Sequence, residues 1–183
     1  MNINYSGSAQ EFLTVQSKNE SRIFFTVEAL MSTGFVLYME KHDNKIYTTY
    51  SAIEKIKKLM NSKDKSIAEN AFTSLCHLKK YHEQQRIVFK GIRDIIVNPA
   101  QEILQLMIHY RTKRCISVVS CNKKLAHDIL MLNKLKSSKG YRIHCYDLSN
   151  GGLIYDYEPE NYLQFPDITF LNNPETKFER KGA

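Results

Sequence analysis

The chain has 183 residues and a mass of 21.3 kDa, a length typical of one domain. Hydrophobic residues make up 43% of it, enough for a buried core, and Lys and Arg outnumber Asp and Glu to give a formal net charge of +7. These values exclude a collagen-like, mucin-like or fully disordered chain.

The sequence contains no apolar run of 18 residues, and it starts without a basic stretch followed by an apolar one. We therefore expect neither a membrane span nor a secretion signal. The four cysteines form no CxxC pair, and reduced thiols of this kind are typical of the cytoplasm. A basic cytoplasmic protein without a membrane partner is expected.

Three segments follow from composition: a polar N-terminal tail or edge element over 1–20, one domain over 21–158, and a C-terminal extension over 159–183. Within the domain, the apolar stretch 23–27 predicts a strand buried on both faces.

A helix is expected over 35–40 and a strand rich in β-formers over 45–50. Ser51 and Glu54 have the spacing of a capping box, so Ser51 is predicted to be the N-cap of a helix and Glu54 its capping partner.

The same capping pattern at Ser66 predicts a second helix over 66–84, and a short strand is expected over 86–89. Asn98 followed by Pro99 predicts the start of another helix, because proline suits its first position.

The segment 115–120 predicts a central strand, and Asn122 is expected to cap the helix that follows it. A strand is expected over 141–147, and Gly151-Gly152 predicts a hairpin into 153–155. Strands that alternate with helices predict an α/β fold, a three-layer sandwich with a mostly parallel central sheet flanked by helices.

In such sheets the ligand site lies beyond the carboxyl ends of the strands. That edge is expected to contain 26–28, 51–54, 98–102 and 120–122.

Four segments in order resemble the motifs of the PIN-domain family of metal-dependent ribonucleases, over about residues 22–148. They are Ile-Phe-Phe-Thr-Val-Glu-Ala-Leu-Met at 23–31, Tyr-Ser-Ala-Ile-Glu-Lys-Ile at 50–56, Pro-Ala-Gln-Glu-Ile-Leu at 99–104 and Val-Val-Ser-Cys-Asn-Lys-Lys-Leu-Ala at 118–126. The resemblance implies a PIN-like fold whose members bind Mg²⁺ or Mn²⁺ through several carboxylates and commonly form homodimers.

At the positions of the family's acidic residues this chain has Thr26, Glu54, Ala100 or Gln101, and Asn122. One carboxylate with neutral oxygens is a poor Mg²⁺ site, because Mg²⁺ loses its waters reluctantly. The resemblance with these departures implies a pseudo-nuclease that needs no cofactor and acts as an RNA-binding or protein-interaction module.

The alternative is an active Mg²⁺- or Mn²⁺-dependent ribonuclease, such as the toxin of a toxin–antitoxin pair. Its catalytic residue would be Glu54, and its metal ligands would come from Glu28, Glu54, Glu102 and Asp128. Plainer interpretations exist, since Glu102 and Asp128 also suit favourable charges in the first turn of a helix or solvated helix surfaces.

Lys123 and Lys124 are unusual, because two cations in the first turn of a helix oppose its dipole. An anion bound there would offset that cost, since helix N-termini favour phosphate. Lys123, Lys124, Asn122, Thr26 and Ser120 are therefore the predicted nucleic-acid-binding residues. Cys121 precedes the same helix, which is expected to lower the pKa of its thiol.

Overall fold

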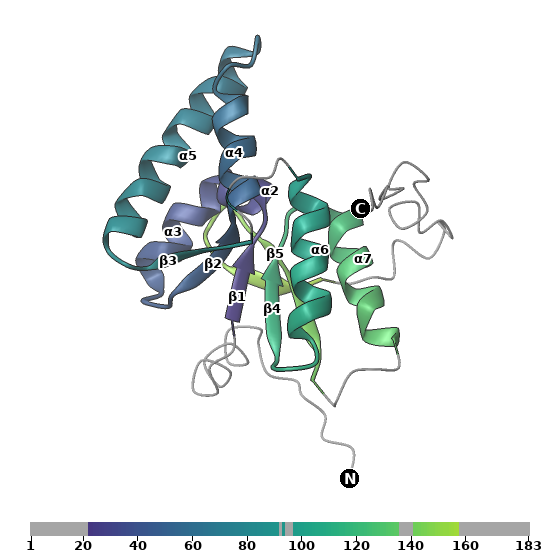
Figure 1. Cartoon of the computed structure of the whole chain (residues 1–183). Helices are drawn as coiled ribbons and strands as arrows, with labels where there is room; N and C mark the ends of the chain where they lie inside the picture. The colour runs from purple at the N-terminus through teal and green to yellow at the C-terminus, as the bar shows by residue number, and fades with distance from the viewer. Residues whose placement is uncertain (1–21, 92, 94–96, 136–140, 158–183) are drawn as a thin grey trace, which may run out of the picture.

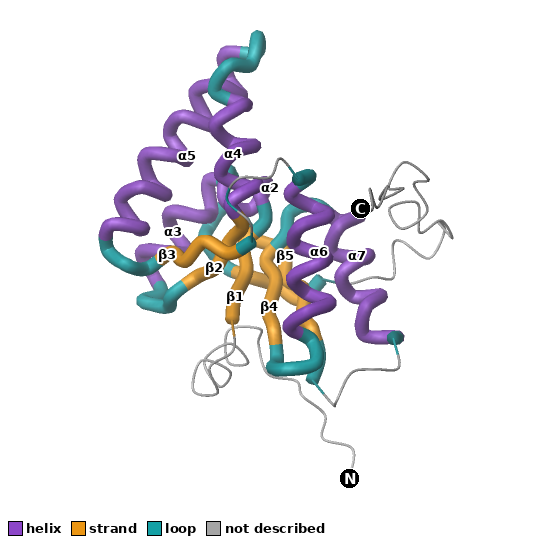
Figure 2. The backbone as a smooth tube through the Cα atoms, in the orientation of Figure 1, coloured by secondary structure: helices purple, strands orange, loops and turns teal. Residues whose placement is uncertain are grey.

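The computed structural model describes residues 22–91, 93, 97–135 and 141–157, and the predicted terminal segments 1–20 and 159–183 lie outside them. A six-stranded, mostly parallel sheet forms the centre, with helices on both faces (Figures 1 and 2). The predicted three-layer α/β architecture is confirmed.

Strands and helices alternate along the chain. The first half contains β1 (Arg22–Phe25), α2 (Val27–Leu30), α3 (Thr33–Lys41), β2 (Ile46–Thr49), α4 (Tyr50–Leu59), α5 (Lys65–Glu83) and β3 (Ile87–Lys90). The second half contains α6 (Pro99–Tyr110), β4 (Ile116–Val119), α7 (Lys123–Met131), the 3₁₀ turn η1 (Leu132–Lys134), β5 (Ile143–Leu148) and β6 (Ile154–Asp156).

The strands lie in the order β3-β2-β1-β4-β5-β6. The chain moves outward from β1 to β3 and then returns to place β4 beside β1, so the strand order reverses between β1 and β4. Phe24 lies opposite Val118 of β4 and Tyr47 of β2, both in parallel register. Only β6 is antiparallel among the described strands, and it pairs with β5 through the predicted Gly151-Gly152 hairpin.

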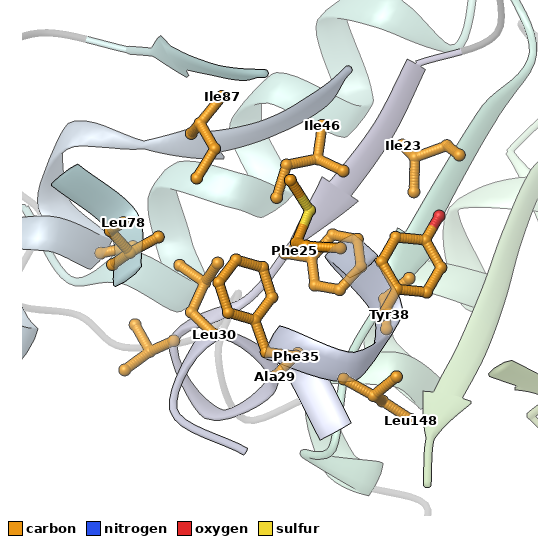
Figure 3. Close-up of a cluster of buried hydrophobic side chains, with 14 of the residues drawn as sticks. Ile23, Phe25, Ala29, Leu30, Phe35, Tyr38, Ile46, Leu78, Ile87 and Leu148 are labelled. Carbon is orange, nitrogen blue, oxygen red and sulfur yellow. The ribbon is translucent and has the colours of Figure 1, made fainter. Parts of the chain in front are cut away.

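Neighbouring residues of β1 supply two separate cores, because successive side chains point to opposite faces of a sheet. Phe25 packs with Phe35 and Tyr38 of α3, with ring centroids 5.7 and 5.0 Å apart (Figure 3). Phe24 packs on the other face, against Ile103 and Met107 of α6 and side chains of α7. The predicted burial of this strand on both faces is therefore confirmed, although β1 ends at Phe25 and Val27 already begins α2.

Helices α4 and α5 pack against each other and extend beyond the sheet as a hairpin (Figure 2). No helix in the described ranges is long and apolar enough to cross a bilayer.

Two predicted helix caps are wrong. Thr49, not Ser51, is the N-cap of α4, and its hydroxyl accepts a hydrogen bond from Ala52 N at 3.1 Å. Asp64, not Ser66, caps α5. In both cases the cap is the last residue with extended backbone, and the serine lies inside the first turn.

The two asparagine caps are confirmed. Asn98 Oδ1 accepts from Ala100 N at 2.9 Å, with Pro99 in the first helical position of α6. Asn122 Oδ1 accepts from Leu125 N at 3.0 Å.

Candidate functional site

A cavity of about 480 Å³, called the cleft below, opens at the carboxyl ends of β1 and β2. The first turns of α4 and α6 form its sides. This is the edge at which open α/β sheets bind ligands, close to the reversal of strand order. The side chains that line the cleft with charge or with a hydroxyl or amide group are Thr26, Glu28, Thr49, Ser51, Glu54, Lys55, Lys58, Arg93 and Asn98.

The innermost polar side chains of this edge are engaged within the protein. Thr26 and Ser120 are buried, and their hydroxyl oxygens lie 3.4 Å apart. Ser120 Oγ also accepts from the Asn122 N–H at 3.2 Å and lies 3.2 Å from the Asn122 carbonyl oxygen. Thr26 lines the cleft, whereas Ser120 and Asn122 are not among its lining residues. A ligand in the cleft could therefore contact Thr26, but not Ser120 or Asn122, of the predicted nucleic-acid-binding residues.

Three exposed cations form what we call the basic wall: Lys55, Lys58 and Arg93. Lys55 and Lys58 lie one turn apart on α4, so they share a face of the helix. The Arg93 guanidinium carbon lies 5.9 Å from the centroid of the Tyr50 ring, a cation–π distance. The cleft-lining acids are Glu28 and Glu54, so its lining carries a net positive charge at neutral pH.

Glu54 is exposed at the cleft and does not act as a capping partner. Its Oε1 lies 2.6 Å from Lys57 Nζ, with both side chains 55% exposed. A surface pair of this kind contributes little stability, about 0.3–0.5 kcal/mol for neighbours on a helix. The capping-box interpretation of Glu54 is therefore wrong, while its predicted place at the carboxyl edge is correct.

Glu102 is the largest departure from the sequence analysis. It was expected as a first-turn charge, on a solvated surface or at a metal. It does lie in the first turn of α6, yet it is only 5% exposed. Its Oε2 accepts from the Ser51 backbone N–H at 3.2 Å and from the Ser51 hydroxyl. Its Oε1 lies against Gly91, where a Cβ would come within 1.8 Å of it. The solvated interpretation is wrong because α4 and the end of β3 close over this side chain.

Asp128 lies on α7, half-buried, and is not among the residues that line the cleft. Its Oδ2 is buried without a hydrogen-bond partner among the described residues. Burial raises the pKa of this carboxyl, and the nearby Lys124 and His127 partly oppose that rise. Asp128 is thus partly desolvated rather than fully solvated.

The donors present do not fit a Mg²⁺ or Mn²⁺ centre of the PIN kind. Glu28 and Glu54 line the cleft, Glu102 is held by Ser51, and Asp128 is elsewhere. Within the described part of the chain, no three His, Cys, Asp or Glu side chains are grouped so that they could hold one ion. The neutral side chains at the family's positions, Thr26 and Asn122, are already hydrogen-bonded.

Lys123 and Lys124 are exposed in the first turn of α7, as predicted, but neither lines the cleft. Leu125 of the same turn does line it, so the two lysines belong to an adjoining surface.

The basic wall was not among the site residues predicted from the sequence. The spacing of Lys55 and Lys58 on a helix that begins at the functional edge was a usable signal. Nothing in the sequence indicates that Arg93 joins them, because its position depends on how the chain continues after β3.

The Cys121 thiol does not have the lowered pKa that its place before a helix suggested. Burial raises its pKa to about 11, and the negative charge of Asp147 adds to the effect. Burial is the largest cause of this rise, so Cys121 is poorly suited to act as a nucleophile.

No family model, curated protein or solved structure matches the chain. The resemblance to the PIN-domain family therefore stays a prediction carried by the motif residues alone.

Proposed function

We propose that the chain is a catalytically degenerate PIN-like module that binds single-stranded RNA in the cleft through the phosphate backbone. The observation that carries this proposal is the basic wall of Lys55, Lys58 and Arg93 at the ligand-binding edge of the sheet. Phosphate contacts by Lys and Arg supply most of the affinity of sequence-independent nucleic-acid binding.

The net positive charge of the cleft lining favours an anionic ligand that binds the protein directly, without a metal ion between them. Lys55 and Lys58 can contact phosphate directly, and Arg93 can bind it through two parallel N–H donors. The first turn of α6 lies on the opposite side, and the positive end of its helix dipole also favours an anion there. A single strand suits the site better than a duplex, because a cavity of about 480 Å³ is far smaller than a double helix.

The test is RNA binding measured by fluorescence anisotropy with a labelled 12-nucleotide single strand between 50 and 200 mM NaCl. The variant Lys55→Gln/Lys58→Gln removes two cations of the basic wall. The matched control is Lys63→Gln/Lys65→Gln, two exposed lysines near the start of α5 that do not line the cleft. Both variants lose the same net charge, so a difference between them reports position.

We expect wild-type binding that weakens with salt, and a clear loss of affinity in the Lys55/Lys58 variant. Its plot of log K against log salt should be shallower by about 1.4, since each phosphate contact to a single strand contributes about 0.7. The control should keep the wild-type slope. No binding at 50 mM NaCl, or equal slopes in the two variants, would overturn the proposal.

The same samples test the ribonuclease alternative. Glu28 and Glu54 are the carboxylates of the cleft lining, so a metal-dependent activity there would need them. Incubation of the labelled RNA with Mn²⁺ or Mg²⁺ should leave it intact. Cleavage that is lost in a Glu54→Gln variant would replace the binding module with the enzyme.

A further inference from the structure

We infer that Glu102 is a positioning residue that sets the geometry of the basic wall, an inference that rests on the RNA-binding function proposed above. Its side chain extends from the first turn of α6 to contact the start of α4 and the residue that follows β3.

The link to α4 is the more direct one. Glu102 Oε2 accepts two hydrogen bonds from Ser51, one from the backbone N–H at 3.2 Å and one from the hydroxyl. The Ser51 hydroxyl also lies 3.0 Å from Thr49 Oγ1, which caps the helix through Ala52 N at 3.1 Å. A side chain of α6 therefore fixes the first turn of the helix that carries Lys55 and Lys58.

The link to β3 runs through Gly91. This glycine has φ +94°, a conformation that L side chains rarely adopt, and a Cβ on it would lie 1.8 Å from Glu102 Oε1. Gly91 precedes Arg93 by two residues. Close approach of the carboxyl group to the glycine therefore constrains where the chain leaves β3, two residues before the third cation of the basic wall.

A positioning role and a purely electrostatic role for Glu102 predict opposite changes in RNA affinity when its side chain is removed. If Glu102 acted only through its charge, its removal would make the cleft more positive and strengthen RNA binding. If it positions the basic wall, Glu102→Ala should weaken binding although the net charge rises. Glu102→Gln should restore binding, because the amide oxygen can still accept from Ser51.

The experiment compares Glu102→Ala, Glu102→Gln and Gly91→Ala by anisotropy with the same 12-nucleotide RNA across the same salt range. Gly91→Ala keeps every charge but displaces the carboxyl group or the Gly91 backbone, whose φ of +94° an alanine rarely adopts. Gly151→Ala is the control for a Gly→Ala change in open space, since a Cβ there meets only Ser149 Oγ at 3.8 Å. Thermal unfolding followed by circular dichroism shows that each protein is folded at the assay temperature. Ser51→Ala serves as a milder variant that keeps the backbone hydrogen bond, in case Glu102→Ala or Gly91→Ala does not fold.

We expect Glu102→Ala and Gly91→Ala to lose affinity and to show a salt slope shallower by about 0.7 or more, one phosphate contact or more. Glu102→Gln and Gly151→Ala should keep the wild-type slope, and Ser51→Ala should fall between. A variant that is merely less stable loses active protein but keeps its salt slope. Folded Glu102→Ala that binds as well as wild type, or better, would overturn the inference, whereas no binding by wild type would overturn the proposed function instead.

Discussion

The hydroxyl groups of Thr26 and Ser120 lie 3.4 Å apart and join the end of β1 to the end of β4 where the strand order reverses. Both side chains are buried, at 4% and 1% exposed. This point of an open α/β sheet commonly binds the ligand, and here the two side chains that meet there are neutral and buried, although Thr26 also lines the cleft. The positive charges lie on α4 and after β3, in the basic wall. We therefore expect an anionic ligand to bind on that side of the cleft rather than between Thr26 and Ser120.

A Thr26→Asp variant tests how closed this point is. Burial should raise the pKa of the introduced carboxyl above its unfolded value of about 3.9. At any pH above that value the folded state must either bury a charge or take up a proton, and both lower the free energy of unfolding. We expect it to be less stable than wild type at pH 8, with the deficit shrinking as the pH falls towards about 4. Urea denaturation at pH 8, 5.5 and 4 measures this.

Thr26→Val is the control, because it removes only the hydrogen bond to Ser120 and should cost about 1 kcal/mol at every pH. Thr26→Asp as stable as Thr26→Val at pH 8 would show that a carboxylate is accommodated there, and a metal site at the end of β1 would regain support.

Gly34 tests the packing of α3 against the loop between β5 and β6. A Cβ at this position would lie 1.9 Å from the backbone oxygen of Ser149, and backbone cannot rotate away as a side chain can. We expect Gly34→Ala to lower the free energy of unfolding by about 3 kcal/mol, at the upper end of ordinary overpacking. Chemical denaturation measures the loss, and Gly151→Ala in the same loop should stay within about 0.5 kcal/mol of wild type. If Gly34→Ala were as stable as wild type, the β5–β6 loop would be able to shift away from α3 at no cost.

The fold could be predicted because local sequence patterns, such as apolar runs and helix-capping residues, indicate which segments are buried and where helices begin. The continuous apolar run at 23–27 indicated a strand covered on both faces, and Phe24 and Phe25 do lie in separate cores. Asn98 and Asn122 were identified as caps because their side chains act on backbone N–H groups two or three residues away. Such contacts depend on a few neighbouring residues and are therefore visible in the sequence.

The site was only half predictable, because its decisive contacts join distant residues. Thr26 and Glu54 do reach the cleft, as the carboxyl-edge argument required. Glu102 and Ser51 are 51 residues apart, and no local pattern indicates that one will accept hydrogen bonds from the other. The same contact explains the capping error, since Ser51 directs its hydroxyl towards Glu102 while Thr49 caps the helix.

Asp128→Asn should stabilise the protein at neutral pH. Burial raises the pKa of the Asp128 carboxyl in the folded state, so the folded state disfavours the ionised form that exists at pH 7. The amide removes this penalty, and the gain should disappear as the pH falls below about 3.9, where wild-type Asp128 is protonated in both states. Denaturant unfolding at pH 7 and at pH 3.5 measures the difference. A loss of stability at pH 7 would mean that the carboxylate has a favourable partner, as a metal ligand would.

Lys123 and Lys124 decide whether α7 shares in RNA binding. Neither lysine lines the cleft, so Lys123→Gln/Lys124→Gln should lose less affinity than Lys55→Gln/Lys58→Gln in the same anisotropy assay. The loss should still exceed that of the Lys63/Lys65 control, because Leu125 of the same turn reaches the cleft and a bound strand leaving it would pass the first turn of α7. If the Lys123/Lys124 variant instead loses most of the affinity and most of the salt slope, the phosphate backbone lies on α7 and the basic wall of α4 is secondary.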